Sequence, residues 1–373
     1  MKNAASGSDS GKNVLCIGDL GWKEERKCDL RYFFHYEGAE FVNLGQNRPR
    51  HALDRLVSLS EAKKRFLSGQ YEVVVAGSIP TPFLNPRKGF LHRWGNYAGR
   101  MLHIPSVREA IRGEQMLKLF SPRLVALDLE DRPIIDNHRF TAGRLCQLFF
   151  KRELPQNPAN AFLYTTDKNE DNGNIPRQPF FAHFIEKLRP ISIGVEPAIL
   201  ERGKSRAWEK TADVFFVGRV ANRPNRPTGM KQLERLREEG FRMDLPQTKV
   251  NRTDFFERCA ASLSVWSPEG FGYDCTRTYE AAAMGSVPIL QYPTIQRHAP
   301  LVDGKHALYY GVEGDELYRL LRHWLAHPEA LREIGRAAQE QVARHHTFGQ
   351  LAQYVVETAK ATIAAGPQGN IRR

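Results

Sequence analysis

The chain has 373 residues, of which 41% are hydrophobic and 26% are charged. This length is too great for one ordinary core and suits two domains, and the composition is that of a folded globular protein rather than a disordered one. The sequence contains no apolar run near the roughly 18 residues that span a bilayer. Its polar first residues lack the apolar stretch of a secretory signal, so we expect a cytoplasmic protein.

The cysteines and the net charge indicate the redox state of the thiols and the kind of partner that the protein binds. The five cysteines are scattered and lack metal-ligand spacing, so we expect reduced thiols rather than disulfides. The net charge of +12 indicates an anionic partner, either a phosphorylated ligand, a nucleic acid or the inner face of a membrane. A basic solvated surface without such a partner is the alternative.

Short apolar runs in the first half of the chain alternate with amphipathic segments. The runs expected to form buried strands are Val14 to Gly18, Ala39 to Gly45, Tyr71 to Gly77 and Leu124 to Leu129. Between the second and the third, Leu53 to Leu67 carries apolar residues at helical spacing. Strands in alternation with helices predict a parallel sheet that helices cover on both faces.

The same alternation starts again after a proline-rich junction near residue 190. Strands are expected at Asp213 to Gly218, Ser262 to Trp266 and Val287 to Leu290, with a helix at Met230 to Glu239 and further helices from about residue 317 onward. We therefore predict an α/β protein with two Rossmann-like domains, 12–190 and 191–365, which face each other across a cleft. The last helix could pack back on the first domain. Ligands of such sheets bind outside the carboxyl ends of the strands.

The most informative segment is Ser267 to Tyr292, in which a glycine-containing turn, a helix and a strand follow one another. Asp274 or Thr276 is expected to cap the N-terminus of this helix. Gly285 suits the C′ position, where glycine adopts the left-handed conformation without steric cost.

Two charged residues on this predicted helix suggest a ligand. Arg277 and Glu280 are three positions apart, so they share one face near the helix N-terminus. There an arginine can donate two hydrogen bonds to a diphosphate, and a carboxylate one turn further on can accept hydrogen bonds from ribose hydroxyls. The alternative is an i,i+3 salt bridge on a surface helix, which contributes little.

The pattern Gly…Arg-x-x-Glu-Ala…Gly-x-Val-Pro-Ile in this segment resembles the donor-site helix of exostosin-like and spore-coat-type glycosyltransferases. It is also similar to the Glu-Gly-Phe-Gly…Glu-Ala segment of the large retaining GT-B group. The resemblance implies the GT-B fold, with Glu280 at the nucleotide ribose and Arg277 at the diphosphate. In the retaining pattern Glu269 would bind the transferred sugar. Ten residues separate Glu269 from Glu280 where that group has seven, which weakly favours an inverting enzyme.

A second part of the resemblance lies just after the first strand of the second half. The Gly218-Arg219 turn is similar to the one that opens the C-terminal domain of GT-B enzymes, which implies that Arg219 reaches the donor phosphates. Arg223, Arg226 and Lys231 lie in the same stretch and could assist. GT-B enzymes neutralise the diphosphate with a helix dipole and basic side chains, so no essential metal and no metal ligands are expected.

In this architecture the first half of the chain binds the acceptor and supplies a general base if the enzyme inverts. Asp131 and His138, which follow a predicted strand, are the candidate catalytic residues. Ordinary turn or capping roles are the alternative for both. Lys151 and Arg152 either face the cleft or solvate a helix end, and solvation is slightly favoured.

The leading hypothesis is a glycosyltransferase, hexosyl- or related, that moves a sugar from a nucleotide sugar to an acceptor hydroxyl group. The donor would be a UDP-, GDP- or similar sugar acting as co-substrate, with no other essential cofactor. A saccharide, a lipid-linked glycan or a protein is the expected acceptor. One alternative is a DNA-modifying glycosyltransferase that acts on a hydroxylated base, because the basic chain would attract the phosphate backbone. Another is a non-catalytic protein that binds nucleotide sugars or glycans.

Overall fold

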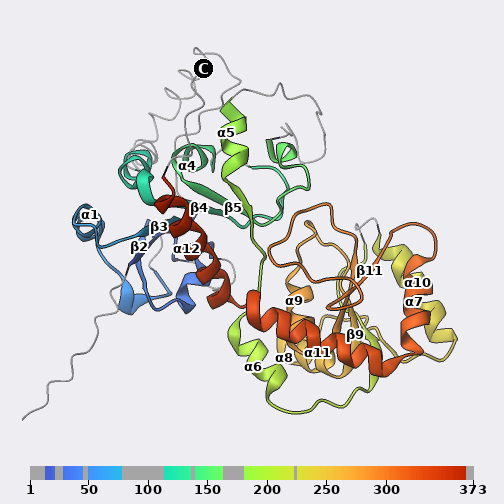
Figure 1. Ribbon diagram of the computed structural model, residues 1–373. Coiled ribbons are helices and arrows are strands. Elements are labelled where there is room, and N and C mark those ends of the chain that lie inside the picture. Colours follow the sequence, from blue (N-terminus) through green and yellow to red (C-terminus); the bar gives the residue numbers. More distant parts are fainter. Residues whose placement is uncertain are drawn as a thin grey trace, which may run out of the picture.

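The computed structural model describes residues 13–21, 28–44, 49–77, 113–135, 139–162, 180–221 and 225–366. Within these residues the chain forms two parallel sheets, each flanked by helices (Figure 1). The predicted α/β class is therefore confirmed. Among the helices of this described part, none combines the length and the apolar character needed to cross a membrane.

The N-terminal sheet has the strand order β2-β1-β3-β4-β5-β6. Its strands are β1 (Val14–Gly18), β2 (Ala39–Asn43), β3 (Val73–Ala76), β4 (Leu124–Asp128), β5 (Leu148–Lys151) and β6 (Leu188–Pro190). The flanking elements are η2 (Arg31–His35), η3 (Leu53–Arg55), α1 (Leu59–Leu67), η4 (Ser121–Arg123), α4 (Phe140–Leu145), η6 (Pro158–Phe162) and α5 (Phe180–Lys187). Every residue of β1, β3, β4 and β5 is buried, as expected for a parallel sheet covered on both faces.

The C-terminal sheet has the order β11-β10-β9-β7-β8. Its strands are β7 (Ala212–Phe215), β8 (Met243–Asp244), β9 (Ser262–Trp266), β10 (Val287–Gln291) and β11 (Leu308–Tyr310). Its helices are α6 (Pro197–Lys204), α7 (Arg226–Glu238), α8 (Arg252–Ala260), α9 (Thr276–Ala283), α10 (Glu316–Leu325) and α11 (Pro328–His345). The direction in which strands are added reverses between β7 and β9, and such a switch point is where open α/β sheets bind ligands.

The predicted strands are present, with ends that differ by up to three residues. The expected helix over residues 53–67 is instead two elements, η3 and α1. The division falls at Ser58, whose hydroxyl accepts a hydrogen bond from the Glu61 N–H and so begins a new helix.

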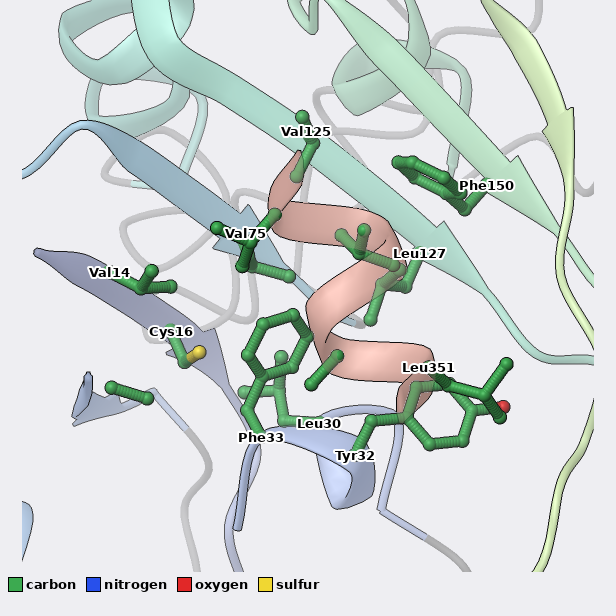
Figure 2. Packing of buried hydrophobic residues seen from close by; sticks show 14 of the residues in the cluster. Val14, Cys16, Leu30, Tyr32, Phe33, Val75, Val125, Leu127, Phe150 and Leu351 are labelled. Carbon is green, nitrogen blue, oxygen red and sulfur yellow. The ribbon is translucent and has the colours of Figure 1, made fainter. Parts of the chain in front are cut away.

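The last helix, α12 (Phe348–Ala364), leaves the C-terminal sheet and covers the N-terminal one. Figure 1 shows α11 along the C-terminal sheet and α12 against the strands of the first half. In Figure 2, Leu351 of α12 lies in the same buried cluster as Tyr32 of η2 and Leu127 of β4. The chain therefore crosses between the two sheets twice, once after β6 and once after α11.

His346 lies at this second crossing and is buried. Its Nε2 is 2.9 Å from the Ala299 carbonyl oxygen, and its Nδ1 is 2.8 Å from the Ser192 hydroxyl. Because a carbonyl oxygen can only accept, Nε2 carries the proton and the Ser192 hydroxyl donates to Nδ1. Burial lowers the pKa of His346 to about 3. The electrostatic influence of three neighbouring side chains lowers this pKa further, those of His298, His345 and Arg297.

Acidification is therefore expected to destabilise the protein through His346. Its pKa falls from 6.5 to about 3 on folding, so the unfolded chain binds more protons between these values, and stability falls as the pH drops below 6.5. At pH 5 the loss is about 2 kcal/mol. Urea unfolding at pH 7 and pH 5, with the wild type and with His346→Gln, measures it. If the variant lost as much stability as the wild type on acidification, His346 would not be the origin.

Candidate active site

Helix α9 begins at the carboxyl ends of β7 and β9. The residue that caps its N-terminus is not one of the two predicted. Cys275 occupies the N-cap position, and its side chain makes no capping hydrogen bond. Asp274 is not a cap, because its carboxylate accepts from the Ile193 N–H at 2.5 Å and from the Tyr279 hydroxyl at 2.7 Å. At the other end, Gly285 has φ of +75°, which confirms its predicted C′ role.

Arg277 extends from α9 to the end of β7. Its Nη2 donates to the Val217 carbonyl oxygen at 2.9 Å, and its guanidinium carbon lies 5.0 Å from the centre of the Phe216 ring. Its Nε and Nη1 are buried and have no hydrogen-bond partner among the described residues. Leaving such donors unpaired is costly, so these two nitrogens are suited to bind an anion.

Gly218 and Arg219 form the turn that faces this guanidinium. A Cβ atom at Gly218 would lie only 2.9 Å from Arg277 Nη2, so the absence of a side chain allows the arginine to approach the backbone. The Arg219 side chain is exposed. Arg226 is buried and donates to the Arg219 carbonyl oxygen at 2.7 Å, so it supports the turn. Arg223 lies outside the described residues.

Glu280 lies one turn further along α9 and lines a small cavity of about 50 Å³. Residues of both halves form this cavity, including Arg31 and Phe348. The Glu280 carboxylate is 3.9 Å from Arg252 Nη2, and Arg252 also pairs with Glu196 at 2.7 Å. Arg277 and Glu280 thus flank the first two turns of α9, with Arg277 directed to the β7 turn and Glu280 to the start of α8.

Glu269 lines a pocket at the carboxyl ends of β9, β10 and β11, and Glu280 is not among the described residues that line it. Its Oε1 accepts from Asn225 Nδ2 at 2.8 Å, and its N–H donates to Gln291 Oε1 at 3.0 Å.

Of the two candidate bases in the N-terminal half, the structure describes Asp131 alone. Asp131 is half exposed and forms an ion pair with Arg152. His138 lies outside the described residues. No group of three or more His, Cys, Asp or Glu side chains in the described part is arranged to hold a metal ion.

The sequence patterns did not identify the residues that join the two halves beside α9. Lys151 and Arg152 are buried, which corrects the expectation that they solvate a helix end. Lys151 pairs with Asp128 at 2.9 Å inside the sheet. Arg152 donates to the Asp274 carbonyl oxygen and pairs with Asp131, so it reaches across the cleft.

Glu153 makes the second connection. Its carboxylate accepts from the N–H groups of Tyr273 at 3.0 Å and Asp274 at 2.9 Å, on the turn that leads into α9. Burial, and then the neighbouring Asp274 carboxylate, raise the pKa of Glu153. The only signal in the sequence is a charged triplet directly after the buried strand residues Phe149 and Phe150.

Known proteins resemble the chain in its C-terminal half and in its fold. Residues 246–357 match the family described as glycosyl transferase-like. No curated protein is significantly similar in sequence. Among solved structures, apo OtsA aligns with a TM-score of 0.53 at 10% identity, over 93% of this chain and 99% of that one. Sucrose-phosphate synthase from Thermosynechococcus elongatus aligns at 0.48 and 12% identity, over 95% and 100%. HepE from Anabaena in complex with UDP aligns at 0.47 and 13% identity, over 94% and 100%.

The matched segment contains α9 with both Arg277 and Glu280, and the two parallel sheets are those of the GT-B fold. The fold of the chain is therefore that of GT-B proteins, as the resemblance implied. Within this fold, residues 246–357 are similar to the glycosyl transferase-like family.

Proposed function

We propose that the protein is a glycosyltransferase that binds its nucleoside diphosphate sugar at the switch point between β7 and β9, with Arg277 at the diphosphate and Glu280 at the ribose. The observation that carries the proposal is the Arg277 guanidinium, in which two buried nitrogens beside the Gly218 turn have no partner among the described residues. The N-terminus of α9 adds partial positive charge at the same place. The proposed domains are residues 12–190 and 191–365, a division that the end of β6 at Pro190 supports.

Charge develops on the diphosphate as the bond to the sugar breaks, so donors already held in position lower the barrier. Arg277 and Arg219 supply this stabilisation without a metal ion. An inverting reaction needs a base for the acceptor hydroxyl, and Asp131 and His138 remain the candidates for this role. A saccharide, a lipid-linked glycan or a protein is the proposed acceptor, and the charge of +12 adds membrane lipids and DNA to the acceptors to be screened.

The donor is identified by incubating the protein with UDP-, GDP-, dTDP- and CMP-sugars and measuring binding and slow hydrolysis. Binding of none of them would contradict the proposal. The role of Glu280 is tested with the 2′-deoxy and 3′-deoxy analogues of the accepted donor. Glu280→Ala is expected to raise KM for the normal donor about tenfold to a hundredfold, the effect of losing a hydrogen bond to a charged group, with a smaller change in kcat.

A coupling experiment separates a ribose contact from a general disturbance. If Glu280 binds a ribose hydroxyl, the analogue that lacks this hydroxyl loses affinity for the wild type but not for the variant. Equal discrimination by both proteins would remove Glu280 from the ribose site. Glu257→Ala, an exposed carboxylate on the neighbouring α8, serves as the control and is expected to leave KM unchanged.

A further inference from the structure

A second pocket lies at the carboxyl ends of β9, β10 and β11, and we name it the strand-end pocket. Its volume is about 360 Å³, within the range of roughly 300–1,000 Å³ that small-molecule sites have. The lining residues that matter here are Glu269, Gln291, Tyr292, Tyr310, Glu313 and Glu316. Three of these are carboxylates, and no lysine or arginine is among the described residues that line the pocket.

A buried donor in this pocket lacks a partner. Gln291 is only 4% exposed, and its Oε1 is used by the Glu269 N–H. Its Nε2 is buried and has no hydrogen-bond partner among the described residues. Because a buried donor left unpaired is costly, the amide indicates a ligand that brings a hydrogen-bond acceptor into the pocket.

The remaining walls suit a sugar ring. The Tyr310 hydroxyl accepts from Trp266 Nε1 at 2.8 Å, which leaves its own proton available to a ligand. Tyr292 is 59% exposed and its ring stacks on Tyr309, with 5.7 Å between the ring centres. Carboxylates accept hydrogen bonds from hydroxyl groups, and an aromatic ring offers an apolar surface beside them.

The strand-end pocket is physically joined to the proposed diphosphate site. The Arg226 guanidinium donates to the Arg219 carbonyl oxygen at 2.7 Å and to the Glu269 carbonyl oxygen at 2.7 Å. One buried side chain thus holds both the β7 turn and the edge of the pocket. The strand-end pocket is therefore a neighbour of the proposed diphosphate site.

We propose that the strand-end pocket binds the transferred sugar and that its charge selects an uncharged hexose over a hexuronate. This inference rests on the donor site proposed above. A carboxylate on the sugar would face Glu269, Glu313 and Glu316, and like charges at short range repel. A metal ion is a poorer occupant, because the described residues contain no group of three or more side chains placed to hold one, and Gln291 Nε2 needs an acceptor rather than a cation.

The test compares donors that differ only at C6 of the sugar. Isothermal titration calorimetry first measures UDP, GDP, dTDP and CMP, which show whether the nucleotide site exists. It then compares UDP-glucose with UDP-glucuronate and GDP-mannose with GDP-mannuronate. For the base that is bound, we expect the neutral sugar to bind at least about tenfold more tightly than the uronate. Equal binding of both sugars would overturn the inference.

Three variants make the assignment specific. Gln291→Glu keeps the acceptor for the Glu269 N–H but removes the free amide donor. This variant is expected to bind the neutral nucleotide sugar about tenfold more weakly than the wild type does. Its affinity for the bare nucleoside diphosphate is expected to change hardly at all. Glu313 is exposed, so Glu313→Gln is not expected to disturb folding. Combined with Glu269→Gln, it is expected to reduce the preference in affinity for the hexose donor over the hexuronate donor about tenfold. Gln353→Glu on α12 is the matched control and is expected to change neither quantity.

The outcomes distinguish the two proposals. If none of the nucleotides UDP, GDP, dTDP and CMP binds, the proposed donor site fails and the inference fails with it. If a nucleoside diphosphate binds but the sugar pairs show no preference, or Gln291→Glu weakens the bare diphosphate as much as the sugar donor, the inference alone is overturned.

Discussion

Replacing Arg277 by alanine is expected to lower kcat/KM for the nucleotide sugar by about 10²- to 10³-fold. This is the usual effect of removing one positioned donor that stabilises charge in the transition state. Arg277→Lys retains the charge but not the planar pair of N–H groups, so its activity is expected to fall between those of the wild type and the alanine variant. Steady-state kinetics with the accepted donor measure all three proteins.

The same substitution has a distinctive effect on stability. Two of the Arg277 nitrogens are buried without a partner among the described residues, so their removal is expected to leave the melting temperature unchanged or to raise it. A purely structural arginine would show the reverse, with lost stability and retained activity. Arg237→Ala, an exposed arginine on α7 that pairs with Glu234, is the control and is expected to change neither property.

Replacing Glu153 by alanine is expected to destabilise the protein by about 3 kcal/mol. The substitution leaves the buried N–H groups of Tyr273 and Asp274 without their acceptor, and it removes a carboxylate from beside the buried Arg152. Glu153→Gln retains one acceptor oxygen, so we expect it to lose about half as much. Urea unfolding at pH 7 gives both values.

Because Glu153 joins the two halves, its loss is also expected to change how cooperatively they unfold. The probes are tryptophan fluorescence, to which the C-terminal half contributes three of the five tryptophans (Trp208, Trp266 and Trp324), and far-ultraviolet circular dichroism, which reports on both halves. Separate transitions for the two probes would show this. Glu196→Ala removes an exposed ion pair near the same crossing and is expected to cost less than about 1 kcal/mol. A Glu153→Ala variant as stable as Glu196→Ala would show that the contact across the cleft contributes little.

The fold and helix α9 could be predicted because they depend on local patterns. The buried strands are continuous apolar runs that end near glycine, and Gly285 marks the end of the helix that carries Arg277 and Glu280. The roles of Glu153 and Asp274 could not be read in this way, because these two residues are 121 positions apart and meet only when the sheets face each other. Asp274 has the composition of a helix cap, but a hydrogen bond from Ile193 draws its carboxylate into the crossing between the halves.

The sequence also placed Glu269 and Glu280 in one candidate donor site, and this stays a prediction. In the structure Glu280 lines the small cavity beside Arg252, and Glu269 lines the strand-end pocket. The sequence gives even less indication of a role for Gln291. A single glutamine at the end of an apolar strand suggests a binding site only when the residues at the neighbouring strand ends are known.

The position of α12 has a consequence for how the protein is made. The N-terminal sheet is completed by α12, so its core lacks Phe348, Leu351 and Val355 until this helix has left the ribosome. The first half therefore waits until the C-terminal sheet has been synthesised, while the C-terminal sheet can fold from contiguous sequence. We expect a fragment that stops before α12 to expose the apolar face seen in Figure 2 and to depend on chaperones, and a co-expressed α12 segment to restore its solubility.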